Sequence, residues 1–230
     1  EQGERMRREF TANVSHELKT PLTAISGMAE IIKDGLVDPK DVAGFAGDIY
    51  KESQRLISLV EDIIHLSRLD EGGDGLKMEP VDLLELASQT ARRLEPVARR
   101  AEVAIEVKGS PAQITGVPAV LDEMVFNLCD NAVKYNRAGG SVTISVEPGE
   151  HETVLTVQDT GIGIPDQDRD RVFERFYRVD KSHSREIGGT GLGLSIVKHG
   201  AAALGIEIRL ESREGVGTSV TLTFPPELIV

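Results

Sequence analysis

The sequence predicts a multidomain protein, in which an all-α helical hairpin is followed by a domain of mixed helices and strands. Three observations predict this fold class: the first seventy residues carry only helical periodicity, a glycine-rich stretch follows at 71–75, and strand-like alternation begins beyond it. A chain of 230 residues has room for two such domains. We place the boundaries at residues 1–71 for the hairpin, 72–79 for a linker and 80–230 for the second domain.

The first helix is predicted by an apolar stripe whose members recur every three or four positions. These are Met6, Phe10, Val14, Leu18, Leu22, Ile25, Ala29 and Ile32. Pro21 lies inside the pattern and should bend the helix, because proline removes a backbone donor. Gly35 should end this helix, and Asp38 with Pro39 should begin the next as N-cap and first helical residue.

The second helix carries a heptad pattern typical of coiled coils. One seam position holds Val42, Ile49, Leu56 and Ile63, and the other holds Phe45, Leu59 and Leu66, interrupted by Glu52. A hairpin cannot bury seams this wide alone, whereas two copies can bury them in a four-helix bundle. We therefore expect a homodimer through residues 1–71.

The second domain is predicted to contain three helices and five strands. The helices are expected at 81–100, with Pro96 weakening the last turn, at 118–135 and at 191–204. The strands alternate apolar and polar residues and are expected at 103–107, 142–146, 154–157, 206–210 and 220–224.

The composition limits the partners and the compartment. There are 26 basic and 38 acidic residues, and the net charge of −12 argues against a nucleic-acid-binding surface. The single cysteine, Cys129, excludes an intrachain disulfide and fits a reducing compartment. No apolar run approaches the roughly 18–20 residues that span a bilayer, and no signal peptide opens the chain. We expect a soluble, intracellular chain.

One histidine on the first helix has the surroundings of a nucleophile. In FTANVSHELKTPL, His16 precedes Glu17 and lies one turn before Thr20. A neutral imidazole nitrogen is a good nucleophile at neutral pH, and an adjacent carboxylate can stabilise the positive charge that develops on attack. The alternative is a solvated surface pair without chemistry.

The helix at 118–135 presents groups suited to a metal and a phosphate. In NLCDNAVKYN, Asn127 and Asn131 are four residues apart and share a face, with Lys134 one turn beyond. Side-chain carbonyls suit Mg²⁺, and an ammonium suits phosphate. The alternative is the wet side of an amphipathic helix.

The segment VQDTGIGIP has the features of a base-binding turn. Its strand ends at Asp159, whose carboxylate can accept a hydrogen bond from an exocyclic amino group such as that of adenine. Gly161 and Gly163 let the backbone approach a flat ring closely. An ordinary Asp-Thr-Gly turn is the alternative.

A second glycine-rich turn, GGTGLGLSIVKHG, precedes a helix and so suits a phosphate. Its glycines are Gly188, Gly189, Gly191 and Gly193. They do not form the dinucleotide pattern, and the chain contains no P-loop.

The connection between the two turns, residues 166–187, is long enough to be a functional lid. Phe173, Phe176 and Tyr177 can pin it to the domain, leaving Arg178 or Lys181 to face a phosphate. The alternative is an amphipathic surface helix.

Together with Gly215-Val216-Gly217-Thr218, these segments resemble, in order and spacing, the catalytic core of a class I sensor histidine kinase. The resemblance covers nearly the whole chain, and the sequence around His16 is similar to that of the phosphate-regulon branch of these kinases. It implies that residues 1–71 are a dimerisation and phosphoacceptor domain, a four-helix bundle in the dimer. The remainder would be an α/β-sandwich ATP-binding domain of the gyrase, chaperone and histidine-kinase type.

The resemblance also implies a role for each site residue. His16 would be the phosphoacceptor, Glu17 its orienting base, and Thr20 would position water for dephosphorylation of the partner. Around ATP, it implies Asn131 at Mg²⁺, Asn127, Lys134 and Tyr135 near the phosphates, Asp159, Gly161, Gly163 and Thr218 at adenine, Arg178 at the γ-phosphate, and Gly189, Gly191 and Gly193 at the hinge of the lid. One position departs from the family pattern, because Asn136 stands where a small hydroxyl residue is usual.

The implied activity is ATP- and Mg²⁺-dependent autophosphorylation of His16, followed by transfer to an aspartate of a response regulator receiver domain, with phosphatase activity toward that regulator. The implied location is the cytoplasmic side of the cell membrane, connected through segments that precede this chain. Two alternatives remain: an adenine-nucleotide switch that never phosphorylates, which the His16–Glu17 pair argues against, and a dimerising coiled coil with a degenerate second domain, which Asn131 and Asp159 argue against.

Overall fold

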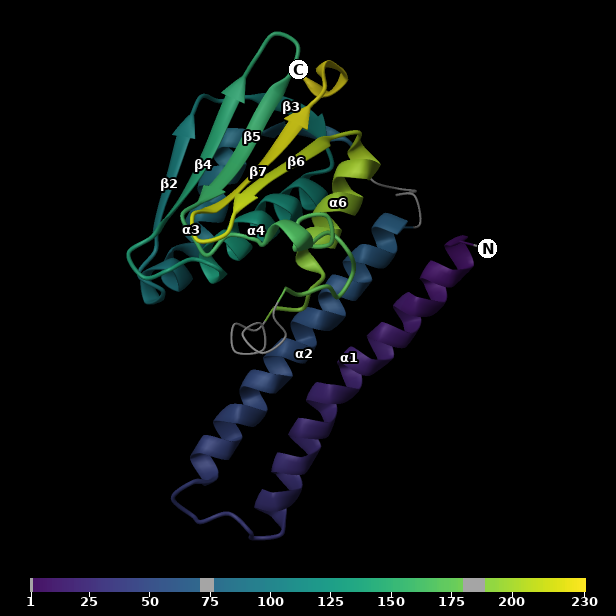
Figure 1. The fold of residues 1–230 in the computed structure, drawn as a ribbon, viewed down its shortest axis with the longest axis vertical. Coiled ribbons are helices and arrows are strands. Elements are labelled where there is room, and N and C mark those ends of the chain that lie inside the picture. Colours follow the sequence, from purple (N-terminus) through teal and green to yellow (C-terminus); the bar gives the residue numbers. More distant parts are fainter. Residues whose placement is uncertain (1, 71–76, 180–188) are drawn as a thin grey trace.

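The structure is a computed structural model that describes residues 2–70, 77–179 and 189–230. Helices α1 (Gln2–Lys33) and α2 (Val42–Asp70) form a long antiparallel hairpin. The α/β domain lies beside the C-terminal part of α2, away from the hairpin turn (Figure 1). This arrangement confirms the predicted fold class. The linker predicted at 72–79 falls mostly on residues 71–76, which lie outside the described residues.

The hairpin turn differs from the prediction at the start of its second helix. Gly35 has a left-handed φ of +69° and ends the first helix as expected. The Asp38 side chain accepts a hydrogen bond from the Lys40 backbone N–H at 3.2 Å, and the Asp38 carbonyl accepts one from Asp41 at 2.8 Å. These bonds form a separate turn, so the helix begins at Val42 and the prediction of Pro39 as its first residue was wrong. The first helix runs continuously through Pro21.

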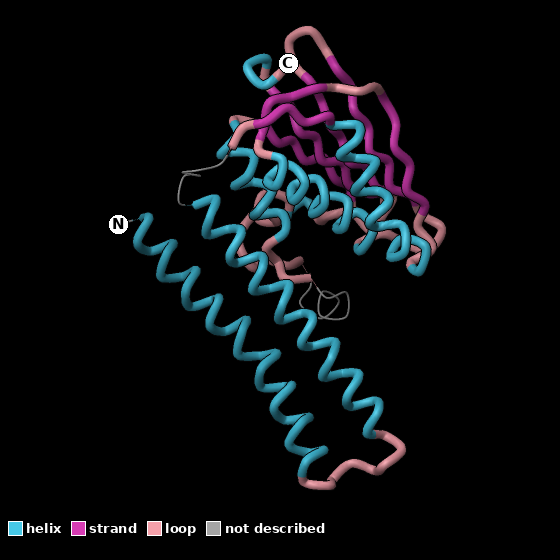
Figure 2. The backbone as a smooth tube through the Cα atoms, turned by 180° about the vertical axis from the view of Figure 1, so that it is seen from behind, coloured by secondary structure: helices cyan, strands magenta, loops and turns pink. Residues whose placement is uncertain are grey.

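The second domain is built on a five-stranded sheet in the order β2 (Ala104–Gly109), β4 (Ser141–Pro148), β5 (Thr153–Asp159), β7 (Gly217–Phe224) and β6 (Glu207–Arg213). β2 and β4 are parallel, and the other pairs are antiparallel. Helices α3 (Leu83–Arg100), α4 (Pro118–Lys134) and α6 (Gly193–Leu204) cover one face, as the view from behind shows (Figure 2). All five predicted strands are present.

A small second sheet was missed in the prediction. β1 (Glu79–Asp82) pairs antiparallel with β3 (Gln113–Gly116), and both strands are only four residues long. β1 occupies the first two residues predicted as helix, so α3 begins at Leu83. Asp82 caps it, because its side chain accepts hydrogen bonds from the Leu84 and Glu85 backbones at 2.9 and 3.0 Å. Pro96 lies inside α3, which continues to Arg100.

The core of the second domain is largely aliphatic, with Phe224 among its few aromatic members. A second apolar cluster joins the two domains: Leu59 and Leu66 of α2 are buried together with Leu192 and Ile196 at the start of α6. Phe10, Leu18 and Phe176 pack against this cluster. The hairpin and the second domain are therefore docked on each other, which determines what surrounds the site described below.

No helix among the described residues combines the length and the apolar character that crossing a membrane requires.

Candidate active site

A cavity of about 590 Å³ opens between α4, the end of β5, the two glycine-rich turns and α2. This volume lies within the range of small-molecule sites in proteins, roughly 300–1,000 Å³. The structure brings most of the predicted nucleotide residues together around it. Those that line it are Asn127, Asn131, Lys134, Tyr135, Asp159, Gly163, Arg178, Gly189, Gly191, Gly193 and Thr218.

Asp159 lies at the end of β5 with its carboxylate fixed by the backbone. Its Oδ1 accepts hydrogen bonds from the Gly161 N–H at 2.8 Å and the Thr218 N–H at 3.2 Å. Burial raises the pKa of Asp159, against the lowering effect of these two bonds. The acid is thus oriented at the cavity wall, where it can accept a hydrogen bond from a ligand amino group.

Two glycines are required where the turns around Asp159 pack on each other. Gly163 has a φ of +71°, and a Cβ there would lie 2.1 Å from the Arg213 carbonyl oxygen. Gly217 has a φ of +143°, and a Cβ there would lie 2.1 Å from the Asp159 carbonyl oxygen. Gly161 is buried, and its N–H is one of the two that donate to the Asp159 carboxylate. These residues keep the backbone close to the floor of the cavity.

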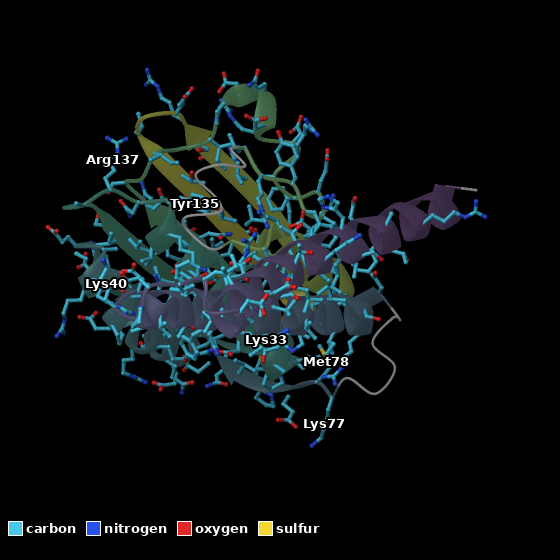
Figure 3. All side chains as sticks on the ribbon, turned by 90° about the horizontal axis from the view of Figure 1, so that it is seen from below. Lys33, Lys40, Lys77, Met78, Tyr135 and Arg137 are labelled. Atoms are coloured by element: carbon cyan, nitrogen blue, oxygen red, sulfur yellow. The ribbon has the colours of Figure 1, made fainter. Side chains whose placement is uncertain are left out.

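Arg137 also holds this region together and was missed in the sequence analysis. Its guanidinium Nη2 donates to the Gly161 carbonyl oxygen at 2.9 Å and to the Gly215 carbonyl oxygen. It therefore connects the turn after Asp159 to the turn before β7, next to Tyr135 at the end of α4 (Figure 3). A single arginine in a turn gives no sequence signal for this role, because its two acceptors are backbone oxygens from distant segments.

The polar face of α4 is partly engaged within the protein. Asn127 donates from Nδ2 to the Glu123 carbonyl oxygen at 3.0 Å, and Lys134 forms an ion pair with Asp130 at 2.6 Å. Asn131 is half-buried and lines the cavity. The described residues contain no group of three or more His, Cys, Asp or Glu that could hold a metal ion. A single amide fits Mg²⁺ all the same, because this ion is usually held by one or two protein groups together with phosphate oxygens and water.

Asn136, the departure from the family pattern, does donate hydrogen bonds. Its Nδ2 donates to the carbonyl oxygens of Ala132 at 3.1 Å and Ser141 at 3.0 Å. These acceptors belong to α4 and β4, so Asn136 joins helix and sheet and is not one of the residues that line the cavity.

The segment predicted to be a lid, residues 166–187, is described as far as Val179, and Lys181 lies outside the described residues. Its described part holds a short 3₁₀ helix, Asp166–Asp168, and turns, with no α-helix. Phe176 donates its backbone N–H to the Gly191 carbonyl oxygen at 2.8 Å, and Tyr177 donates its hydroxyl to the Asp168 carboxylate. Phe176 therefore joins this segment to the glycine-rich turn before α6, whereas the Tyr177–Asp168 bond lies within the segment itself.

His16 is exposed on α1 and is not one of the residues that line the cavity. Its side chain is 78% exposed, with Nδ1 3.7 Å from Glu17 Oε1. Thr20 donates its hydroxyl to the His16 carbonyl oxygen at 3.2 Å. The other carboxylate oxygen of Glu17 lies 3.5 Å from the guanidinium of Arg178. Glu17 thus lies between the histidine and the lid, a contact that the sequence did not predict.

α2 contributes a wall of the cavity that was also missed. Ser58, Glu61 and Asp62 line it. Asp62 Oδ2 accepts a hydrogen bond from the Thr190 hydroxyl at 2.6 Å. Burial raises the pKa of Asp62 to about 6, despite the lowering effect of this bond. The contribution of α2 depends on how the two domains dock, which a sequence pattern within one helix does not encode.

Fold and site together define a two-part protein: an α/β domain with a cavity between glycine-rich turns, joined to a helical hairpin that carries an exposed histidine. Comparison with known families agrees. Residues 116–228 match "Histidine kinase-, DNA gyrase B-, and HSP90-like ATPase", and residues 6–72 match "His Kinase A (phospho-acceptor) domain". The chain belongs to the histidine kinase family.

Individual relatives agree with this family. The chain is 41% identical to the sensor-like histidine kinase SenX3 of Mycolicibacterium smegmatis over 96% of its length, and 39% identical to the sensor histidine kinase WalK of Bacillus subtilis over 98%. It spans 58% of the first relative and 38% of the second. The solved structure of the Acinetobacter baumannii histidine kinase AdeS is 25% identical, with a TM-score of 0.75 over 91% of this chain and 97% of that one. The mycobacterial sensor histidine kinase MprB is 34% identical over 65% of this chain and 97% of that one, with a TM-score of 0.55.

Proposed function

We propose that this chain is the catalytic core of a sensor histidine kinase, which uses ATP to phosphorylate His16 and then passes the phosphoryl group to an aspartate of a response regulator. One observation carries the proposal. The cavity gathers the α4 amides, Asp159 and the glycine-rich turns, while Arg178 at its edge contacts Glu17, the neighbour of His16.

In the first step His16 attacks the γ-phosphorus of ATP. Since Nδ1 is the ring nitrogen that faces Glu17, Nε2 is the attacking atom. The new N–P bond forms as the bond between the γ-phosphorus and the oxygen of the ADP leaving group breaks. The Glu17 carboxylate stabilises the positive charge on the ring, and the Nδ1 proton passes toward it. Catalysis is mainly positioning and charge neutralisation. His16 does not line the cavity, so the second domain must move relative to α1 before transfer.

The bound nucleotide is held from three sides in this proposal. Asp159 reads the adenine amino group, with Gly161, Gly163 and Thr218 shaping the floor. Lys134 and Arg178 face the phosphates, with Asn127 and Tyr135 near them, and Gly189, Gly191 and Gly193 form the hinge of the lid. Mg²⁺, when bound, neutralises phosphate charge, and Asn131 is the residue that would hold it.

In the second step the phosphohistidine N–P bond breaks as the aspartate of the regulator forms its acyl phosphate. A solved structure with this fold, the histidine kinase ThkA, 22% identical with a TM-score of 0.76, is in complex with the response regulator protein TrrA. That complex supports a receiver domain as the partner. In the reverse mode Thr20 positions the water that hydrolyses the aspartyl phosphate.

The domain division that we propose is 1–71 for dimerisation and phosphotransfer, 72–79 for the linker and 80–230 for nucleotide binding. Its support is that α2 ends at Asp70 and that β1 begins at Glu79, the last residue of the linker as proposed. We also propose that this part of the protein works as a homodimer on the cytoplasmic side of the cell membrane. The similarity to sensor kinases supports that location.

Incubation with γ-labelled ATP and Mg²⁺ tests the proposal. The chain should acquire label that is labile in acid and stable in alkali, and His16→Gln should abolish it. His151→Gln, which changes an exposed histidine in the turn between β4 and β5, should keep full labelling. Label that persists in His16→Gln would overturn the assignment of the phosphoacceptor.

A further inference from the structure

The wall that α2 contributes to the cavity carries two neighbouring acidic residues, Glu61 and Asp62. Asp62 is half-buried, and its carboxylate accepts the hydroxyl hydrogen bond of Thr190. Glu61, one residue earlier, lines the same cavity. A carboxylate of the hairpin therefore lines the cavity in which the proposed function places ATP, itself a polyanion.

Thr190 belongs to the glycine-rich turn that the proposed function places at the hinge of the lid, near the phosphates of ATP. It stands between Gly189 and Gly191, and all three residues line the cavity. Its hydroxyl oxygen also accepts a hydrogen bond from the Leu192 N–H at 3.2 Å, at the N-cap of α6. Helix N-termini preceded by glycines suit phosphate groups, because their backbone N–H groups point outward. Lys134 is near enough to Asp62 to oppose the rise in the pKa of this acid that burial causes.

We propose that the Asp62–Thr190 hydrogen bond is an autoinhibitory contact, for which the phosphate tail of ATP competes, so that nucleotide binding releases the second domain from α2. The inference rests on the proposed ATP binding. Two anions in one partly enclosed cavity repel each other, more strongly than in bulk water. A released domain is free to carry ATP to His16, which the docked arrangement keeps outside the cavity.

Among the described residues, several other docking contacts end on residues that do not line the cavity, whereas the Glu17–Arg178 contact ends on one that does. Arg175 donates to both carboxylate oxygens of Asp70 at 2.8 Å, and His199 Nδ1 lies 3.0 Å from the same group. His65 pairs with Glu123. These contacts hold the second domain on α2 without facing the phosphates. Asp62 is therefore the place where charge can be removed with the rest of the docking interface intact.

Competition of this kind is reciprocal: if docking weakens nucleotide binding, nucleotide binding weakens docking by the same factor. Both halves can be measured on the full chain. The first experiment is calorimetric titration of a non-hydrolysable ATP analogue with Mg²⁺. Asp62→Asn keeps an acceptor for Thr190 and removes the charge, so the analogue should bind roughly tenfold more tightly.

Asp48→Asn is the matched control, because it removes the same charge from the same helix. Asp48 forms an exposed pair with Lys51 at 3.7 Å and does not line the cavity. Its dissociation constant should equal that of the unmodified chain. An unchanged constant in Asp62→Asn, or an equal gain in both variants, would overturn the autoinhibitory contact.

The second experiment is hydrogen–deuterium exchange of the unmodified chain with and without saturating analogue. Amides in residues 56–66 of α2 should exchange faster when the analogue is bound. Slower or unchanged exchange in a chain that binds the analogue would overturn the release while leaving the proposed function standing. Failure to bind the analogue at all would overturn the proposed function, and the autoinhibitory contact with it.

Discussion

Asp159 is the residue whose ionisation connects the local geometry to nucleotide recognition. A single carboxylate oxygen, Oδ1, accepts the hydrogen bonds from both backbone N–H groups, those of Gly161 and Thr218. An asparagine oxygen can accept the same two bonds, so Asp159→Asn should leave the fold intact. Because the amide oxygen keeps both backbone bonds, an NH2 donor takes the place of the other carboxylate oxygen, so a ligand amino group loses both its acceptor and the negative charge, and hydrogen bonds to charged groups are the stronger kind.

We predict that Asp159→Asn lowers the affinity for an ATP analogue at least roughly tenfold, since a hydrogen bond to a charged group contributes about 1.5–3 kcal/mol. The free energy of unfolding at pH 7 should be equal or higher. Burial raises the pKa of Asp159, so its ionised form opposes folding at neutral pH, and this opposition disappears as the pH falls through the raised value. Titration calorimetry and urea unfolding measure the two quantities.

The same shift predicts the pH dependence of binding. Protonation removes the acceptor charge, and because the pKa is raised, affinity should begin to fall at a higher pH than an ordinary aspartate would give. Asp122→Asn is the control, since Asp122 pairs with Arg93 on the exposed side of α4. If Asp159→Asn bound as tightly as the control, Asp159 would not read the base.

For single residues, the sequence indicated which side chains are candidates for the chemistry, but it did not indicate which distant residues they contact. The types and spacing of His16, Asn131 and Asp159 carry their chemistry, because each lies in a short local motif. The contact of Glu17 with Arg178 and that of Asp62 with Thr190 join residues 161 and 128 positions apart. No local pattern encodes such pairs, because they depend on how two domains dock.

The turns and helices were predictable where a long periodic pattern or a required backbone conformation defined them. The five strands of the main sheet alternate clearly, and buried Val142, Ile144 and Val146 show the alternation in β4. β1 and β3 were missed because four residues give too few alternations to identify. The start of α2 was misplaced because Asp38 caps a separate turn.

Gly163 provides a prediction about one such turn. Gly163→Ala should destabilise the protein by at least about 1–2 kcal/mol, because a left-handed backbone is costly for a residue with Cβ and the added atom meets the Arg213 carbonyl. Binding of an ATP analogue should weaken as well, since the turn forms the floor of the cavity. Thermal unfolding and calorimetric titration give the two results.

Gly44→Ala is the contrasting change. Gly44 is an exposed position in α2, and the Cβ that alanine adds there would have nothing within 4 Å. Alanine should therefore leave stability unchanged or raise it by up to about 1 kcal/mol, because it favours a helix more than glycine does. Equal melting temperatures for Gly163→Ala and the unmodified chain would show that the turn tolerates a side chain.

Across the whole molecule, α2 presents apolar residues in two directions. Leu59 and Leu66, one predicted seam of the coiled coil, are buried in the cluster that includes Leu192 and Ile196 of the second domain. A second set stays exposed on the same helix: Tyr50, Ile57, Val60 and Ile64. The predicted heptad seams include Leu59 and Leu66 but none of the exposed set, so the sequence analysis missed this face. Apolar spacing along one helix does not tell which residues face the second domain and which face another chain.

The exposed set predicts where two chains meet. Ile57, Val60 and Ile64 are 50%, 40% and 44% exposed and recur at helical spacing, so they form one face of α2. A second copy would bury this face and complete the four-helix bundle. The unmodified chain should therefore sediment at twice the mass of one chain, and Ile57→Glu with Val60→Glu should shift it to monomer at micromolar concentration.

Met78→Glu is the control: it adds charge at an equally exposed apolar residue outside the hairpin and should leave the dimer intact (Figure 3). A monomeric unmodified chain, or a double variant that still dimerises, would mean that this face is covered by something other than a second copy.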